Sequence, residues 1–168
     1  MSIFFLPLVP LLSLVPLLLI AVYFDFTTGK IPNWLTLPGT LLGIIFFIPW
    51  FGIHSVVEHF LGSMVVGGVW LIFWHTGIMG GGDQKLMLMV GAWLGYMLAP
   101  LVLFAVAVCG GIQSIAWVLY RRQRVPELSW RQALKTTHIP YSLAVAMGTF
   151  VVIASVYLGS EWLWIFNF

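Results

Sequence analysis

Charged residues are scarce in this 168-residue chain: they make up 7% of it, whereas hydrophobic residues make up 61% and the mean hydropathy is +1.06. A soluble domain carries about 25% charged residues. The chain therefore has too few polar side chains to cover a water-facing surface, and we expect lipid to surround most of it. The length suits one membrane-embedded domain over residues 1–168. The net charge of +2 gives no support for nucleic-acid binding.

Cysteine is nearly absent as well. Cys109 is the single one, so no intrachain disulfide can form, and its place in an apolar run predicts a packing role. The first residues lack the basic region of a cleavable signal peptide, and no small-residue cleavage site follows the first apolar stretch. We therefore expect that stretch to remain in the protein as a helix.

Long apolar runs fill most of the chain, which favours membrane helices over the short alternating strands of a barrel. A span needs about 20 apolar residues. As one helix, residues 84–120 would be about 55 Å long against an apolar membrane core of about 30 Å, so we place a break at Gly95 and Pro100. The resulting all-α, polytopic prediction has six spans: Ile3–Phe24, Trp34–Phe51, Phe60–Thr76, Leu86–Leu98, Leu101–Tyr120 and Ile139–Tyr157.

The cations predict how these helices are oriented. Every Lys and Arg falls in the loops after the first, third and fifth predicted spans, whereas the opposite side carries only Glu58 and Glu161. By the positive-inside rule the basic side is cytoplasmic, and both chain termini then lie outside. In the last basic loop, Ser129–Gln132 has the form of a capping box. It predicts either a short helix on anionic headgroups or a solvated loop that fixes topology.

Aspartate occurs at two positions, and both lie at the edges of predicted spans: Asp25 ends the first and Asp83 precedes the fourth. An ionisable group at membrane depth is a functional-site hypothesis, because burying it is costly. The predicted topology brings both carboxylates to the cytoplasmic face, where they could share a proton and act as an acid/base pair. Structural roles are the alternatives: Asp25 could pair with Lys30, and Asp83 could cap the fourth helix.

Several residues next to the aspartates could support such a site. The glycines at 80–82 remove side-chain bulk before Asp83, which suits the close approach of an extended substrate strand. Lys85 could act on a nearby carboxylate or on an acidic substrate residue, and we favour snorkelling to the interface. Asn33 could orient Asp25 or cap the second helix, and we favour the cap.

Other polar positions favour structural interpretations. His54 and His59 are predicted to lie on the outer side as interfacial polar groups. Ser63 and Gly67 have small-xxx-small spacing, which predicts close packing between helices within the fold rather than a dimer.

Two segments give the chain a family resemblance. Asp25-Phe-Thr-Thr-Gly-Lys-Ile-Pro-Asn33, followed further along by Gly80-Gly-Gly-Asp-Gln-Lys-Leu86, closely resembles the prepilin peptidases, the type IV leader peptidase group of GxGD aspartic proteases. Ile139-Pro140-Tyr141 is similar to a further feature of that family. The resemblance implies that Asp25 and Asp83 are the catalytic pair. It implies substrate-binding or supporting roles for Ile31, Pro32, Asn33, Gly80, Gly81, Gly82, Lys85, Pro140 and Tyr141.

The resemblance also implies an activity. The chain would be an aspartic endopeptidase of the bacterial cytoplasmic membrane that uses two aspartates and a water molecule, with no metal or cofactor. Its substrate would be a prepilin or pseudopilin, with a basic leader in the cytoplasm, a cut after glycine and an apolar helix in the bilayer. Family members that also methylate the new N-terminus carry paired Cys-x-x-Cys zinc ligands, which one cysteine cannot supply. The chain therefore resembles the short, peptidase-only form, similar to those that serve tight-adherence (Flp-type) pili.

Two other functions are compatible with the residues. A protease of the same two-aspartate class could act on other membrane proteins. A transporter or proton pathway could use the two carboxylates as relay sites. A relay, however, would need acids spread across the bilayer, whereas Asp25 and Asp83 are expected on one face.

Overall fold

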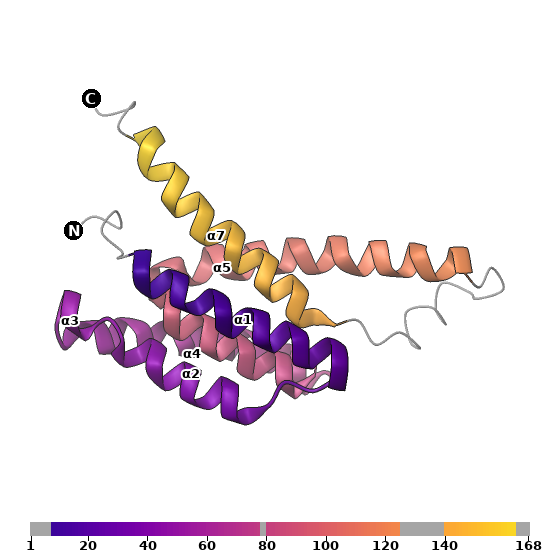
Figure 1. Cartoon of the computed structure of the whole chain (residues 1–168), viewed down its shortest axis with the longest axis horizontal. Helices are drawn as coiled ribbons and strands as arrows, with labels where there is room; N and C mark the ends of the chain where they lie inside the picture. The colour runs from indigo at the N-terminus through magenta and orange to yellow at the C-terminus, as the bar shows by residue number, and fades with distance from the viewer. Residues whose placement is uncertain (1–7, 78–79, 125–139, 164–168) are drawn as a thin grey trace.

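A computed structural model describes residues 8–77, 80–124 and 140–163 of the chain. Every regular element in these three ranges is a helix (Figure 1). The helices are α1 (Leu8–Thr28), α2 (Asn33–Ile45), α3 (Ile48–Phe51), α4 (His54–His75), α5 (Gly81–Arg124) and α7 (Tyr141–Leu163).

Successive helices run back and forth along the long axis of a bundle (Figure 1). α1 runs away from the end at which α3 lies, α2 returns to it, and α4 runs away again. α5 starts at the end opposite α3 and packs against α4, α2 and α7, while α1 packs chiefly on α7. The turn after α1 and the start of α5 therefore lie at the same end of the bundle.

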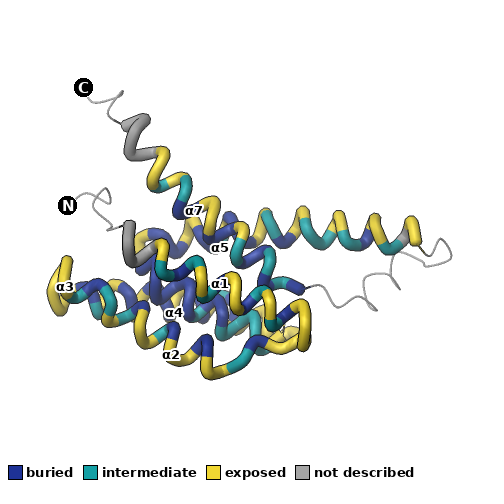
Figure 2. The backbone as a smooth tube through the Cα atoms, in the orientation of Figure 1, coloured by how far each residue is buried: buried dark blue, intermediate teal, exposed yellow. Residues whose placement is uncertain are grey.

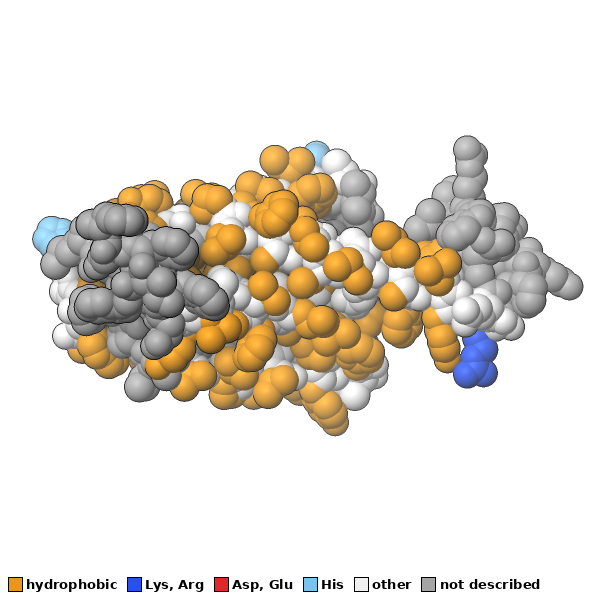
Figure 3. Space-filling model, turned by 90° about the horizontal axis from the view of Figure 1, so that it is seen from above, with side chains coloured by type: hydrophobic (Ala, Val, Ile, Leu, Met, Phe, Trp, Pro, Cys, Tyr) orange, Lys and Arg blue, Asp and Glu red, His pale blue; other side chains and the backbone are white. Residues whose placement is uncertain are grey.

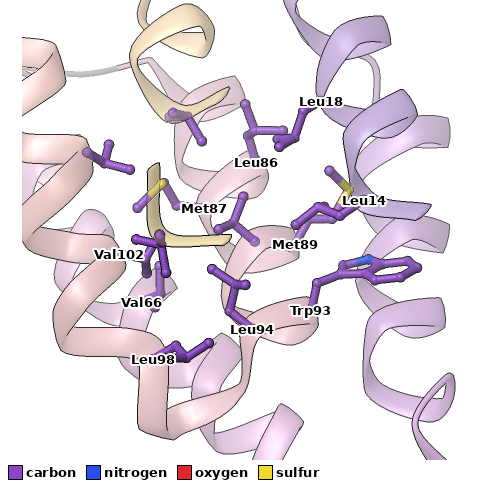
Figure 4. Packing of buried hydrophobic residues seen from close by; sticks show 14 of the residues in the cluster. Leu14, Leu18, Val66, Leu86, Met87, Met89, Trp93, Leu94, Leu98 and Val102 are labelled. Carbon is purple, nitrogen blue, oxygen red and sulfur yellow. The ribbon is translucent and has the colours of Figure 1, made fainter. Parts of the chain in front are cut away.

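The first half of α5 forms the centre of the bundle. Its buried side chains meet residues of α1 and α4 in the cluster that Figure 4 shows, and Figure 2 shows that buried residues concentrate along this part of the chain. Trp93 also donates a hydrogen bond from Nε1 to the carbonyl oxygen of Gly39, at 2.8 Å, which ties α5 to α2. The cluster includes Leu14, Leu18, Val66, Leu86, Met87, Met89 and Trp93. Asp83 precedes this buried segment, so α5 enters the core directly after its carboxylate.

The outer surface of the bundle is apolar. Side chains such as Phe104, Ile112 and Phe150 are exposed, and apolar side chains cover much of the face in Figure 3. Soluble proteins rarely expose contiguous apolar surface of this extent. Among the described residues, four helical stretches are long and apolar enough to cross a membrane: Asn33–Phe51, His54–His75, Gly81–Arg121 and Tyr141–Leu158. These are the helices of an integral membrane protein, while the six-span count and the outer location of both termini stay predictions.

Gly95 divides α5 into two helical halves. Its φ of 72° and ψ of 173° are not helical, and glycine is the residue that adopts a positive φ without strain. The break predicted at Gly95 is therefore confirmed. The expectation that Pro100 takes part in the break is wrong, because Pro100 lies inside the helix that follows.

Two predicted helix boundaries need correction. The second predicted span, Trp34–Phe51, is interrupted, since α2 ends at Ile45 and α3 begins at Ile48. α4 begins at His54 rather than at Phe60. The helix includes the polar residues that precede the apolar run, so the apolar run alone predicts too short a length for α4. The predicted capping box at Ser129–Gln132 lies outside the described residues.

His59 is buried, which corrects its prediction as an interfacial group. The residue is 5% exposed, and its ring stacks on that of Phe47 with centroids 3.9 Å apart. Its Nδ1 lies 2.7 Å from the carbonyl oxygen of Ala92. Carbonyl groups in the last turn before a helix break lose their usual partners, and Ala92 lies in the turn before Gly95. Because a carbonyl oxygen only accepts hydrogen bonds, Nδ1 carries the hydrogen. His59 therefore donates to the Ala92 carbonyl, which lies next to the break in α5.

Replacing His59 with phenylalanine should lower the free energy of unfolding by about 1–3 kcal/mol, because the stack on Phe47 is kept while the Ala92 carbonyl loses its donor. Thermal unfolding in detergent would measure the loss. His54→Phe is the matched control, since His54 is exposed at the start of the same helix. It should change stability by less than about 0.5 kcal/mol. Equal stabilities of the two variants would contradict this role of His59.

Small residues allow α4 and α5 to approach closely. Ser63 Oγ donates a hydrogen bond to the carbonyl oxygen of Leu88 at 3.0 Å, and a Cβ added at Gly67 would overlap the Leu88 side chain. Gly62 and Gly91 face each other's backbone in the same contact. Ser63 and Gly67 therefore pack helices within the fold, as their spacing predicts.

Candidate active site

Asp25 lies in the last turn of α1, and local bonds determine where that helix ends. Gly29 has a φ of 66°, and its N–H donates to the carbonyl oxygen of Asp25 at 3.0 Å. Thr28 Oγ1 donates to the carbonyl oxygen of Phe24 at 2.7 Å. α1 thus stops shortly after Asp25, whose side chain lies inside the bundle with 6% of the residue exposed.

The carboxylate of Asp25 contacts the start of α7. Its Oδ2 accepts hydrogen bonds from Ser142, 2.6 Å from Oγ and 3.3 Å from the backbone N. Because α7 begins at Tyr141, the carboxylate lies at a helix N-terminus, where N–H groups lack intrahelical partners and negative charge is stabilised. Within the described residues, Ser142 is thus the hydrogen-bonding partner of Asp25, in place of the suggested pairing with Lys30.

Asp83 lies in the first turn of α5. Its carboxylate accepts a hydrogen bond from the backbone N–H of Gly80 and interacts electrostatically with Asp25. The bond to Gly80 is the helix-capping role that the sequence left open. The fold therefore brings the two carboxylates together from α1 and α5, while their catalytic role stays a prediction.

The glycines before Asp83 make room for other parts of the same chain. A Cβ added at Gly82 would lie 3.3 Å from the Cβ of Ile31 and 3.4 Å from its backbone N. A Cβ added at Gly81 would lie 3.2 Å from Nε1 of Trp74. The missing side chains thus let the segment before α2 approach the start of α5. The expected contact of these glycines with a substrate strand stays a prediction.

A hydrogen bond joins the two sequence motifs. Lys85 Nζ donates to Oδ1 of Asn33 at 2.8 Å, so the lysine binds α2 rather than only extending to the membrane interface. The preferred interpretation of Asn33 as a cap is wrong, because Pro32 occupies the N-cap position of α2 and no side chain caps it. Asn33 instead connects α2 to α5 beside the buried Ile31.

Pro140 and Tyr141 place the start of α7 beside the carboxylates. The carbonyl oxygen of Pro140 accepts a hydrogen bond from Nε2 of Gln113 at 2.8 Å. The ring of Tyr141 lies over Gly110, where a Cβ would overlap it, and Tyr141 interacts electrostatically with Asp83. The second half of α5 thus holds the segment that supplies the partner of Asp25.

The structure brings the three predicted segments, at 25–33, 80–86 and 140–141, to one end of the bundle. It also adds Ser142, which the sequence analysis missed. The signal was a hydroxyl residue in the first turn of an apolar helix, two positions after a proline. Its bond to Asp25 spans 117 positions of sequence, so no local pattern predicts that partner.

Two neighbouring carboxylates can hold one proton between them, so that one accepts a proton while the other donates one. Such a pair can activate a water molecule and polarise a carbonyl group without a covalent intermediate. The arrangement of Asp25 and Asp83 is therefore suited to acid/base hydrolysis.

Comparisons with known proteins indicate a family of peptidases. Residues 12–115, which include both aspartates, match the model of the type IV leader peptidase family. A relative named prepilin leader peptidase/N-methyltransferase from Escherichia coli (strain K12) is 32% identical over 106 residues, which cover 58% of this chain and 47% of the relative. A relative of the same name from Stutzerimonas stutzeri is 31% identical over 137 residues, covering 77% of this chain and 43% of the relative.

The chain spans less than half the length of these two curated relatives. No solved structure gives a significant match to it. The matched region ends before Ser142, so the start of α7 lies outside the part that the family model covers.

Proposed function

Because the chain belongs to the type IV leader peptidase family, we propose that it is a membrane aspartic endopeptidase that removes the leader from prepilin-like proteins. Asp25 and Asp83 are its catalytic pair. One observation carries the proposal: the only two aspartates in the chain, far apart in sequence, interact at one end of the bundle. Asp25 is buried and Asp83 is half-buried, and two interacting carboxylates in such a place are typical of a functional site.

The mechanism requires one ionised and one protonated carboxylate. The ionised group takes a proton from water while the water oxygen bonds to the scissile carbonyl carbon, and the protonated group gives its proton to the carbonyl oxygen. When the tetrahedral intermediate collapses, the C–N bond breaks and the amine takes the proton held by the first carboxylate. The second carboxylate recovers its proton from one of the two hydroxyl groups. Both aspartates then return to their starting states.

The substrate is a prepilin or pseudopilin processed at the cytoplasmic face of the bacterial inner membrane. Lys30 and Lys85 lie at the same end of the chain's helices as the carboxylates, which supports a cytoplasmic location by the positive-inside rule. A basic leader would remain on that side, the cut would follow a glycine, and the apolar helix of the substrate would stay in the bilayer. A compact system such as Flp-type pili would supply such a substrate.

The proposed activity is cleavage of the leader alone, without the methyltransferase activity that the relatives' names include. Cys109 is the single cysteine of these 168 residues, so a zinc site made of paired cysteines cannot form within them. The carboxylate mechanism needs no metal.

Co-expression with a candidate prepilin tests the proposal. We expect a shortened product whose new N-terminus, determined by mass spectrometry, follows the glycine of the leader. A panel that contains a prepilin, a pseudopilin and an unrelated single-span membrane protein separates a leader peptidase from a broader membrane protease. If purified protein that is folded in lipid cleaves none of the prepilins, the proposal is overturned.

A further inference from the structure

Ser142 contacts the two carboxylate oxygens of Asp25 unequally, because it donates hydrogen bonds to only one of them. Both hydrogen bonds, from Ser142 Oγ at 2.6 Å and from its backbone N at 3.3 Å, end on Oδ2. Both residues are buried, Asp25 at 6% exposure and Ser142 at 0%. Ser142 therefore holds one oxygen of Asp25, and no bond from the described residues of α7 ends on the other oxygen, Oδ1.

We infer that Ser142 is a positioning residue that anchors Asp25 through Oδ2, so that Oδ1 is the oxygen that takes the proton from the attacking water. Asp25 is then the base of the pair and Asp83 the acid that protonates the carbonyl oxygen. This inference rests on the proposed peptidase function and assigns roles within the same site.

The donors around the two carboxylates support this division of roles. Oδ2 of Asp25 accepts from a backbone N–H, which can only donate, and from a hydroxyl at a distance typical of a hydrogen bond to a charged oxygen. Asp83 accepts from the backbone N–H of Gly80. Hydrogen bonds donated to a carboxylate favour its charged form. Among the described residues, Asp25 has a hydroxyl donor in addition to a backbone N–H, which supports its assignment as the base.

The hydrogen bonds from Ser142 also fix the orientation of the Asp25 carboxylate. Asp25 lies in the last turn of α1, and Ser142 lies in the first turn of α7, which Gln113 holds through the carbonyl of Pro140. The rotation of the Asp25 carboxylate is therefore set by α7, a helix that lies far from α1 in the sequence. A base must lie within hydrogen-bond reach of the proton that it removes, and small displacements lower the rate strongly.

Three substitutions at Ser142 test this inference in the full chain reconstituted in lipid with a prepilin substrate. Ser142→Ala and Ser142→Cys remove or weaken the hydroxyl donor, and cysteine is close to serine in size. Both should lower kcat about tenfold and change KM less than about twofold, because the substrate still binds while the base is misplaced. Ser142→Thr keeps the hydroxyl and should retain a kcat above that of the alanine and cysteine variants.

Ser155→Ala is the matched control. Its hydroxyl donates to the carbonyl oxygen of Val152 within α7, so kcat should stay at the wild-type value. Each rate is divided by the concentration of folded protein, which thermal unfolding checks for every variant. A loss of stability alone then lowers the concentration of folded protein and leaves kcat unchanged.

The possible outcomes distinguish a failure of the role of Ser142 from a failure of the proposed peptidase function. A wild-type protein that cleaves the prepilin, with unchanged kcat in Ser142→Ala and Ser142→Cys, would overturn the role of Ser142 and leave the peptidase intact. A threonine variant that folds but is as slow as the cysteine variant would also overturn it, because the hydroxyl would then be irrelevant. A wild-type protein with no activity on any prepilin would overturn the proposed function itself.

Discussion

Asparagine in place of either Asp25 or Asp83 should reduce cleavage of a prepilin by at least about 10³-fold while the protein stays folded in the membrane. An amide can neither take a proton from water nor give one to the carbonyl oxygen, so each substitution removes one half of the mechanism. The side chains keep their size. At position 25 an amide oxygen can still accept from Ser142, which preserves the contact between α1 and α7.

The measurement is the amount of shortened prepilin after co-expression, and single-turnover rates with purified protein would quantify it. Glu58→Gln is the matched control, because Glu58 is an exposed carboxylate on α4, a helix that carries neither aspartate. This variant should cleave at the wild-type rate. Retained cleavage in either aspartate variant would show that Asp25 and Asp83 do not form the catalytic pair.

Much of the site was predictable because it depends on helix direction. Asp25 ends one helix and Asp83 starts another, and the chain runs back and forth, so the two ends meet at the same side of the bundle. The break at Gly95 was predictable for a similar reason. The apolar stretch is too long for one crossing, and glycine is the residue that permits the positive φ found there.

The contacts that complete the site were not predictable. Ser142 reaches Asp25 only because Pro140 and Gln113 place the start of α7, and no periodicity along the chain indicates which helix N-terminus meets which carboxylate. Asn33 was expected to act locally, as a cap, whereas its partner Lys85 lies on another helix. Hydrogen bonds between distant segments depend on packing, which local patterns do not contain.

His59 shows a second reason for such misses. The apolar run predicts a helix that begins at Phe60, which leaves His59 outside it as an interfacial polar group. In the structure α4 starts earlier, and His59 faces the break in α5, where the Ala92 carbonyl needs a donor. Its role follows from the position of the break in space, on a neighbouring helix.

The close contact between α4 and α5 determines where Asp83 lies, because α5 is held by α4 along its buried first half. Gly62 is at the tightest point of this contact. A Cβ added there would lie 2.5 Å from the carbonyl oxygen of Gly91, and it would also overlap the backbone of Gly95. Backbone atoms cannot move aside as a flexible side chain can, so any side chain at 62 must push the two helices apart.

Gly62→Ala should therefore lower the free energy of unfolding by about 3 kcal/mol or more, at the upper end of the effects of overpacking. It should also lower cleavage, because the displaced α5 carries Asp83 away from Asp25. Gly68→Ala, on the same helix, is the matched control. A Cβ at Gly68 meets nothing within 4 Å, so alanine should raise stability by up to about 1 kcal/mol through its helix propensity. Thermal unfolding of both variants in detergent measures the difference, and a Gly62→Ala protein as stable as Gly68→Ala would show that the two helices are not held at this distance.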